Sequence, residues 1–219
     1  MHVRVNAAMS ADGKLSTRRR EQLAISGPED FERVEDVRES VDGILVGAGT
    51  VAADDPHLVL DRDRQRKRQG RGEPSTPARI VADSRARTPP DARILDDVAP
   101  TYVLVGDRAP EDRTSRLKEA GASVVRTAHP RVDLAAAFEQ LEAEGIDRLM
   151  IEGGGEIIFS AFEADLVDEL SVYVGSLIVG GRDAPTLADG EGFVSEFPDL
   201  HLDDVELIDD GVLLSYSVG

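Results

Sequence analysis

Short apolar runs alternate with segments of helical period along most of this chain. The runs have the length of strands and show no strict apolar–polar alternation, which predicts strands buried on both faces of a sheet. Segments 29–41 and 133–144 carry apolar residues every three or four positions, which predicts amphipathic helices between the strands. The predicted strands are Val3–Met9, Gly43–Gly47, Ala78–Ala82, Tyr102–Gly106, Ser123–Arg126, Arg148–Glu152 and Leu170–Val174.

The end of the chain has a different pattern. Two apolar runs, His201–Ile208 and Val212–Val218, flank Asp209-Asp210-Gly211, and Asp-Gly between such runs predicts an antiparallel hairpin. The whole pattern predicts an α/β fold over residues 1–219 as a single domain. Its sheet is expected to be mixed and mostly parallel, with flanking helices and a C-terminal antiparallel hairpin.

One stretch, Asp61–Pro77, interrupts the pattern. It is rich in Arg, Gln, Gly and Pro and has no apolar period, which predicts an exposed basic loop at about 61–77. Such a cluster of cations suits RNA or steers phosphate-bearing substrates. The chain as a whole carries a net charge of −18, which favours a solvated loop over a nucleic-acid site.

Composition narrows the function classes. The net charge of −18 repels nucleic acid and anionic lipid, and no apolar run approaches the roughly 20 residues of a membrane span. The chain has no cysteine and only four histidines, so we expect neither a thiolate nor a zinc site. We expect a cytoplasmic protein with no membrane partner. Its dispersed carboxylates and few lysines suggest a halophilic surface, although an ordinary acidic protein has a similar balance.

Two glycine-rich turns each follow a buried strand. Gly153-Gly154-Gly155 lies between a strand and a helix, where glycines and helix N–H groups suit a pyrophosphate. Gly47-Ala48-Gly49-Thr50 follows an earlier strand and leads to Asp54-Asp55-Pro56. Because ligands bind at the carboxyl ends of parallel strands, we expect both turns to open onto one cleft that holds a dinucleotide. The alternatives are a tight strand-to-helix turn and ordinary helix caps, since G-x-G-x-x-G is absent.

Two further polar segments follow predicted strands. In Asp83-Ser84-Arg85-Ala86-Arg87, a hydroxyl and two guanidiniums suit a phosphate monoester such as the 2′-phosphate of NADPH. Asn6–Leu15 is a strand that ends in the polar turn Asp12-Gly13. An exposed loop and a plain turn are the structural alternatives for these two segments.

In this order and spacing, the four segments resemble the reductases of the riboflavin pathway, from Asn6 to about Ser217. These are stand-alone reductases of ribosylaminopyrimidine phosphate, and the reductase half of bifunctional deaminase/reductases. The most specific stretch is Val46–Leu58. The resemblance implies a dihydrofolate-reductase-like fold, a homodimer and a phosphorylated pyrimidine substrate. It implies NADPH as cofactor, with NADH as an alternative, and reduction of a ribosylamino group to ribitylamino.

The resemblance also implies site residues. Asp54 and Glu152 are the candidate catalytic carboxylates. The implied cofactor contacts are Thr50, Asp54, Ser84, Val132, Gly153, Gly154, Gly155 and Glu156, and the substrate contacts are Asp12, Arg38, Leu58, Arg62 and Glu152.

This chain departs from the bifunctional enzymes at two positions. It has Ala24 where they have an aromatic residue, and Asp61 where they have an Arg, for which Arg62 is the substitute. Because the zinc site of the deaminase half needs cysteines and this sequence has none, we expect no deaminase half in it. Two alternatives remain from the sequence: dihydrofolate reductase, which shares the implied fold and cofactor, and a non-catalytic NADPH-binding sensor.

Overall fold

The computed structural model describes residues 1–21 and 23–219, and the chain forms two compact units. The first unit comprises Met1 and Asp36–Met150, and the second comprises His2–Glu35 and Ile151–Gly219. Helix α1 (Pro28–Ser40) begins in the second unit and ends in the first, and strand β6 (Arg148–Ile151) crosses the other boundary.

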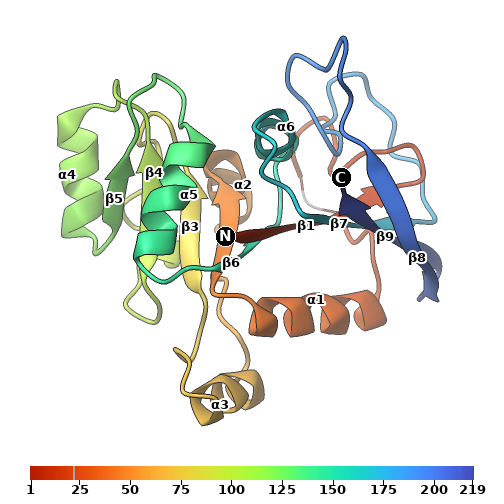
Figure 1. Ribbon diagram of the computed structural model, residues 1–219, viewed down its shortest axis with the longest axis horizontal. Helices are drawn as coiled ribbons and strands as arrows, with labels where there is room; N and C mark the ends of the chain where they lie inside the picture. The colour runs from red at the N-terminus through yellow and green to blue at the C-terminus, as the bar shows by residue number, and fades with distance from the viewer. Residues whose placement is uncertain (22) are drawn as a thin grey trace. The chain divides into compact units, whose positions relative to one another are not determined.

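The first unit is built on strands in the order β5-β4-β3-β2-β6. They are β2 (Gly43–Gly47), β3 (Ala78–Ala82), β4 (Thr101–Val105), β5 (Ser123–Arg126) and β6. Successive pairs from β2 to β5 are parallel. The side chains of Ile44, Ile80 and Val103 are fully buried, as expected for strands with apolar side chains on both faces. The helices are α2 (Ala48–Asp54), α3 (Arg62–Gly70), α4 (Glu111–Glu119) and α5 (Leu134–Ala143), and α4 and α5 lie beside β5 (Figure 1).

The second unit has strands in the order β1-β7-β9-β8 and the helix α6 (Gly155–Glu163). Strand β1 (His2–Ser10) runs parallel to β7 (Glu169–Gly175), and β8 (Leu200–Ile208) and β9 (Gly211–Val218) form the antiparallel hairpin (Figure 1). Ile25, Tyr173 and Leu213 form a buried cluster beside it. The predicted mostly parallel sheet and the C-terminal hairpin are therefore confirmed.

The prediction of a loop at 61–77 is wrong over Arg62–Gly70, which forms helix α3. Asp61 begins this helix as its N-cap, because its Oδ1 accepts hydrogen bonds from the backbone N–H groups of Asp63 (2.8 Å) and Arg64 (3.0 Å). Periodicity did not reveal the helix because its inward side chain is Arg68, whose side chain is only 1% exposed. The guanidinium of Arg68 donates to the carbonyl oxygens of Glu39 and Val41, each at 2.7 Å, and Pro74 at 2.8 Å.

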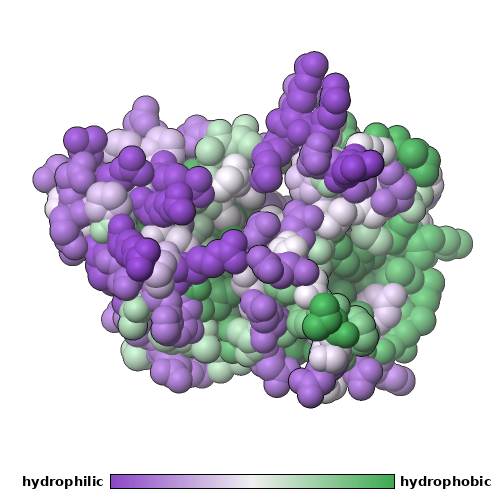
Figure 2. All heavy atoms as spheres, turned by 90° about the horizontal axis from the view of Figure 1, so that it is seen from above, coloured by the Kyte–Doolittle hydropathy of each residue, from purple (hydrophilic) through white to green (hydrophobic). Residues whose placement is uncertain are grey.

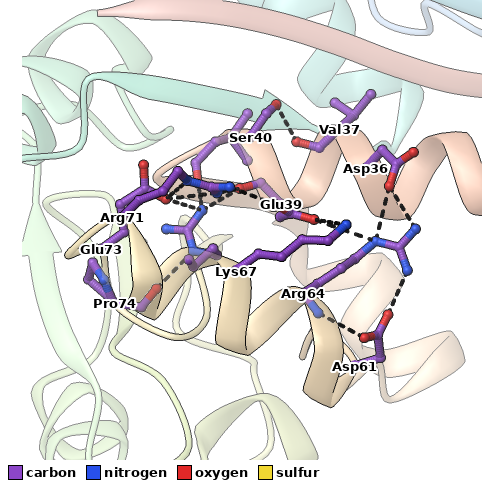
Figure 3. Close-up of polar contacts among 12 residues, drawn as sticks. Asp36, Val37, Glu39, Ser40, Asp61, Arg64, Lys67, Arg71, Glu73 and Pro74 are labelled. Atoms are coloured by element: carbon purple, nitrogen blue, oxygen red, sulfur yellow. Dashed lines mark hydrogen bonds and ion pairs between the residues drawn. The ribbon is translucent and has the colours of Figure 1, made fainter.

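Three other cations, Arg64, Lys67 and Arg71, pair with the acidic end of α1 (Figure 3). Arg64 Nη2 lies 2.7 Å from Asp36 Oδ1, and Arg71 Nη1 lies 2.8 Å from Glu39 Oε1. The hydrogen bond from Arg71 lowers the pKa of the Glu39 carboxyl. Much of the basic cluster is thus paired with carboxylates of the same chain.

Candidate functional site

Three predicted cofactor contacts of the first unit, Thr50, Asp54 and Ser84, follow two neighbouring parallel strands. Strand β2 ends at Gly47 and is followed at once by α2, which carries Thr50 and Asp54. Ser84 follows β3, and Gly47 pairs with Ala82 in the register of these parallel strands. The turns that bear Thr50 and Ser84 therefore follow the carboxyl ends of neighbouring strands, where α/β sheets bind ligands.

The two aspartates at the end of α2 have different roles. Asp55 takes a left-handed backbone conformation and its Oδ1 accepts a hydrogen bond from Arg93 N at 2.8 Å, so this carboxylate fixes a turn. Asp54 is exposed on one side. Protein on its other side removes water from the carboxyl group and raises its pKa. The role of Asp54 as a catalytic carboxylate stays a prediction.

Leu58 follows the same turn and is 8% exposed. Its φ of 51° places a non-glycine residue in the left-handed region, a strain of about 1–3 kcal/mol that proteins retain mainly at functional sites. The neighbouring His57 is held by Asp96, with 2.5 Å between Nε2 and Oδ2. The backbone around the predicted substrate contact Leu58 is thus fixed by its surroundings.

Ser84 and Val132, two predicted cofactor contacts, lie together. Val132 N donates a hydrogen bond of 3.0 Å to Ser84 Oγ, which joins the turn after β3 to the segment before α5. Buried Asp83 shapes the same turn, because its Oδ2 accepts from Thr88 N (2.6 Å) and Thr88 Oγ1 (2.8 Å). Sequence reasoning missed this role of Asp83, for which the only signal was its position beside Ser84.

In the second unit, the glycine turn leaves open space beside a helix start. Gly153 and Gly154 have φ values of 133° and 69°, and no heavy atom of the described residues lies within 4 Å of the place that a Cβ would occupy at either position. Helix α6 begins at Gly155 with Gly154 as N-cap, a residue that has no side chain to cap the first N–H groups. These donors and this space are compatible with a diphosphate group.

Asp12, another predicted substrate contact, has hydrogen-bond partners within the protein. Asp12 Oδ1 accepts from Ser10 Oγ (2.6 Å) and Val179 N (3.0 Å), and Oδ2 accepts from Gly180 N (2.7 Å). These bonds, the one from Ser10 foremost, lower the pKa of Asp12 to about 2. The carboxylate is therefore engaged within the protein, in the manner of a structural clamp.

Three other residues predicted to contact the substrate are spread over the two units. Arg38 is half-buried in the last turn of α1, in the first unit, and Arg62 is exposed at the start of α3. Glu152 is half-buried directly after β6, in the second unit.

The predicted common cleft is not tested by these placements. Thr50, Asp54, Ser84 and Val132 lie in the first unit, whereas Gly153–Glu156 lies in the second. The dinucleotide that would join the two groups stays a prediction. Among residues 1–21 and 23–219, no group of three or more His, Asp or Glu side chains is arranged to hold a metal ion, and none of the helices there is long and apolar enough to cross a membrane.

Comparisons with known proteins identify the family of the chain. A model of the RibD C-terminal domain matches residues 1–214. The chain is 44% identical to a 2,5-diamino-6-ribosylamino-4(3H)-pyrimidinone 5′-phosphate reductase of Archaeoglobus fulgidus, over 96% of this chain and 94% of that one. It is 45% identical to the protein of the same name from Methanothermobacter thermautotrophicus, over 87% and 85% of the two chains.

Solved structures support the fold. A pyrimidine reductase-like protein from Corynebacterium diphtheriae has a TM-score of 0.88 at 20% identity, covering 99% of this chain and 91% of that one. A deaminase/reductase from Thermotoga maritima has a TM-score of 0.78 at 20% identity, covering 100% of this chain and 56% of that one. From the match over residues 1–214 and the identity to full-length relatives, the chain belongs to the RibD C-terminal domain family.

Proposed function

We propose that this protein reduces the ribosylamino group of 2,5-diamino-6-ribosylamino-4(3H)-pyrimidinone 5′-phosphate to a ribitylamino group in riboflavin biosynthesis. The observation that carries this proposal is the 44% identity to a reductase of that name over nearly the full length of both chains. The two compact units act together as one reductase domain, because the family model runs through both of them. A phosphorylated substrate is retained inside the cell, which favours a cytoplasmic location.

The cofactor contacts proposed for a nicotinamide dinucleotide come from both units. Gly153–Glu156 would hold the diphosphate through backbone N–H groups, and Thr50, Ser84 and Val132 would line the rest. When bound, the reduced nicotinamide supplies the hydride that converts the ring-opened imine of the substrate at C1′ to an amine. The protein residues orient the two molecules and hold the proton that the amine nitrogen takes up.

We assign Asp54 as the residue that donates this proton to the amine nitrogen. Partial burial raises the pKa of its carboxyl, so a larger fraction is protonated near neutral pH than for an exposed aspartate. Glu152 directly precedes the open glycine turn and is the second candidate. We assign Arg38, Leu58 and Arg62 to the substrate, with Arg62 toward its phosphate, because the neighbouring Asp61 is occupied as the N-cap of α3.

NADPH is the proposed cofactor, with NADH as the weaker alternative. Arg85 and Arg87 are both exposed on the turn that Asp83 shapes, and Arg87 Nε lies 4.0 Å from Asp83 Oδ1. Two guanidiniums next to Ser84 suit a phosphate monoester, which NADPH has and NADH lacks.

Replacing both residues by Gln tests this cofactor choice. We expect NADPH binding to weaken about tenfold or more and NADH binding to stay unchanged, since each charge-assisted hydrogen bond contributes about 1.5–3 kcal/mol. Arg113→Gln, a change at an exposed arginine of α4, is the control. An unchanged ratio of the two dissociation constants in the double variant would contradict the assignment.

A homodimer is proposed from the surface of the second unit. Strand β8 is the last strand in its order, and Leu202, Val205 and Leu207 on it are 49%, 53% and 86% exposed. Figure 2 shows hydrophobic side chains gathered on the side of the molecule that carries this strand. An apolar surface of this kind usually marks an interface. Sedimentation should show a dimer that Leu207→Glu dissociates, and a wild-type monomer at micromolar concentration would contradict it.

Transfer of deuterium tests the reaction itself. The purified protein is mixed with the ribosylaminopyrimidine phosphate and NADPH deuterated on either face of C4, and the product is analysed by mass spectrometry. One of the two labelled cofactors should add one deuterium to the ribityl chain. Oxidation of NADPH with dihydrofolate in place of the pyrimidine would identify a dihydrofolate reductase. Tight NADPH binding without turnover of either substrate would identify a sensor.

A further inference from the structure

One segment of the second unit contacts two of the predicted ligand turns. Residues 177–190, which we call the strap, follow β7 and precede the hairpin. The strap contacts the turn after β1, which contains Asp12, and the turn before α6, which contains Gly153–Glu156. Neither role was apparent in the sequence, because the partners are more than 30 residues apart along the chain.

The first half of the strap is fixed to the turn after β1. Asp12 accepts hydrogen bonds from the backbone N–H groups of Val179 (3.0 Å) and Gly180 (2.7 Å). Leu15 N donates to Pro185 O at 2.9 Å, and Lys14 Nζ donates to Ala184 O at 3.3 Å. Both carboxylate oxygens of Asp12 are therefore used to hold the strap.

The second half of the strap is fixed to the glycine turn. Asp189 Oδ1 accepts from Thr186 N (3.0 Å) and Thr186 Oγ1 (2.6 Å), which closes a compact turn. Asp189 N then donates to Gly155 O at 3.1 Å. A Cβ at Gly155 would lie 2.7 Å from Asp189 Oδ2 and would also overlap Thr186 O, so the two backbones touch.

The glycine turn therefore has one packed side and one open side. Gly155 faces the strap, whereas Gly153 and Gly154 have clear space in the described structure where their side chains would be. Consecutive glycines have large conformational freedom. A ligand that must order them on binding loses affinity, because the loss of that freedom costs entropy. A rigid support on the packed side removes that cost before any ligand binds.

We propose that Asp189 is a positioning residue that holds the Gly153–Glu156 turn in its binding conformation, with Asp12 as the second anchor of the strap. This inference rests on the proposed function, in which that turn binds the diphosphate of NADPH. It also reassigns Asp12 from substrate contact to support, because both of its carboxylate oxygens are engaged by protein donors.

Three variants test the role of Asp189. Asp189→Ala removes the acceptor for Thr186, Asp189→Asn keeps an amide oxygen in its place, and Asp183→Ala changes an exposed aspartate of the same strap as a control. In cofactor-free protein, we expect the amides of residues 155–158 to exchange hydrogen faster in Asp189→Ala alone. We expect the dissociation constant for NADPH, followed by its own fluorescence, to rise about five- to tenfold, with kcat at saturating NADPH within about twofold of wild type.

Asp189→Asn should restore slow exchange and most of the NADPH affinity. Unchanged exchange and affinity in Asp189→Ala would overturn the inference, as would an Asn variant as impaired as the Ala variant. A wild-type protein that binds neither NADPH nor NADH would instead refute the proposed function. In that case the exchange comparison, which needs no cofactor, still decides whether Asp189 positions the turn.

Discussion

Replacing Gly154 by Val gives a sharp test of the glycine turn. Gly154 has a φ of 69°, and no atom of the described chain lies within 4 Å of its missing Cβ. The Cβ of the valine would therefore have no protein atom within 4 Å, and the side chain would occupy the space proposed for the diphosphate. The loss of folding stability and the loss of NADPH affinity should therefore be independent, because the first comes from the backbone conformation and the second from the added side chain.

The two magnitudes follow from this geometry. With a φ of 69° and a ψ of 125°, Gly154 lies in a sparsely populated region that costs a residue with a Cβ about 1–3 kcal/mol, which lowers the melting temperature of a chain of this size by about 2–12 °C. Loss of even one charge-assisted hydrogen bond to phosphate costs about 1.5–3 kcal/mol, which weakens NADPH binding at least about tenfold. Affinity should thus fall well beyond what the small loss of stability explains.

Gly145→Val is the matched control. Gly145 follows α5, has a φ of 86°, and likewise has no atom of the described residues within 4 Å of its missing Cβ. It should lower the melting temperature by a similar amount and leave the dissociation constant for NADPH unchanged, as measured by fluorescence titration. Equal NADPH affinity in Gly154→Val and wild type would refute the reasoning, and so would equal weakening in both variants.

Three further predictions concern Asp12, Arg68 and the net charge of the chain. Asp12→Ala should lower the melting temperature above pH 4 and slow turnover by freeing the strap. Hydrogen bonds lower the pKa of Asp12 to about 2, so the contribution of its carboxylate to stability is complete above the unfolded pKa near 4 and should vanish as the pH falls from about 4 to 2. An Asp12→Ala variant with the melting temperature and kinetics of the wild type at pH 7 would exclude a role of Asp12 in both stability and turnover. Arg68→Ala should reduce the free energy of unfolding in urea by at least about 2 kcal/mol, because the buried carbonyl oxygens of Glu39 and Val41 lose the Arg68 guanidinium as donor. A change below about 0.5 kcal/mol would contradict this. If the net charge of −18 reflects a halophilic surface, the melting temperature should rise toward molar KCl, and a flat dependence on KCl would exclude that adaptation.

The sequence by itself determined the features that depend on neighbouring residues. Buried apolar runs predicted the parallel strands, such as β2 and β3, because a strand covered on both faces has no room for polar positions. Asp209-Asp210-Gly211 predicted the hairpin, and Gly153-Gly154 predicted a turn with positive φ angles. The local conformations of the candidate site were therefore predictable to a large extent.

Only the tertiary structure decided which polar side chains support the fold. Helix α3 has no apolar face and is held by Arg68, whose acceptors lie at residues 39, 41 and 74. The sequence did not reveal that Asp12 accepts a hydrogen bond from Val179 or that Asp189 donates one to Gly155, because these partners lie 167 and 34 residues away. A charged side chain has the same local sequence pattern whether it meets water, a ligand or a distant backbone group. The burial and hydrogen bonds that distinguish these roles arise when remote segments pack together.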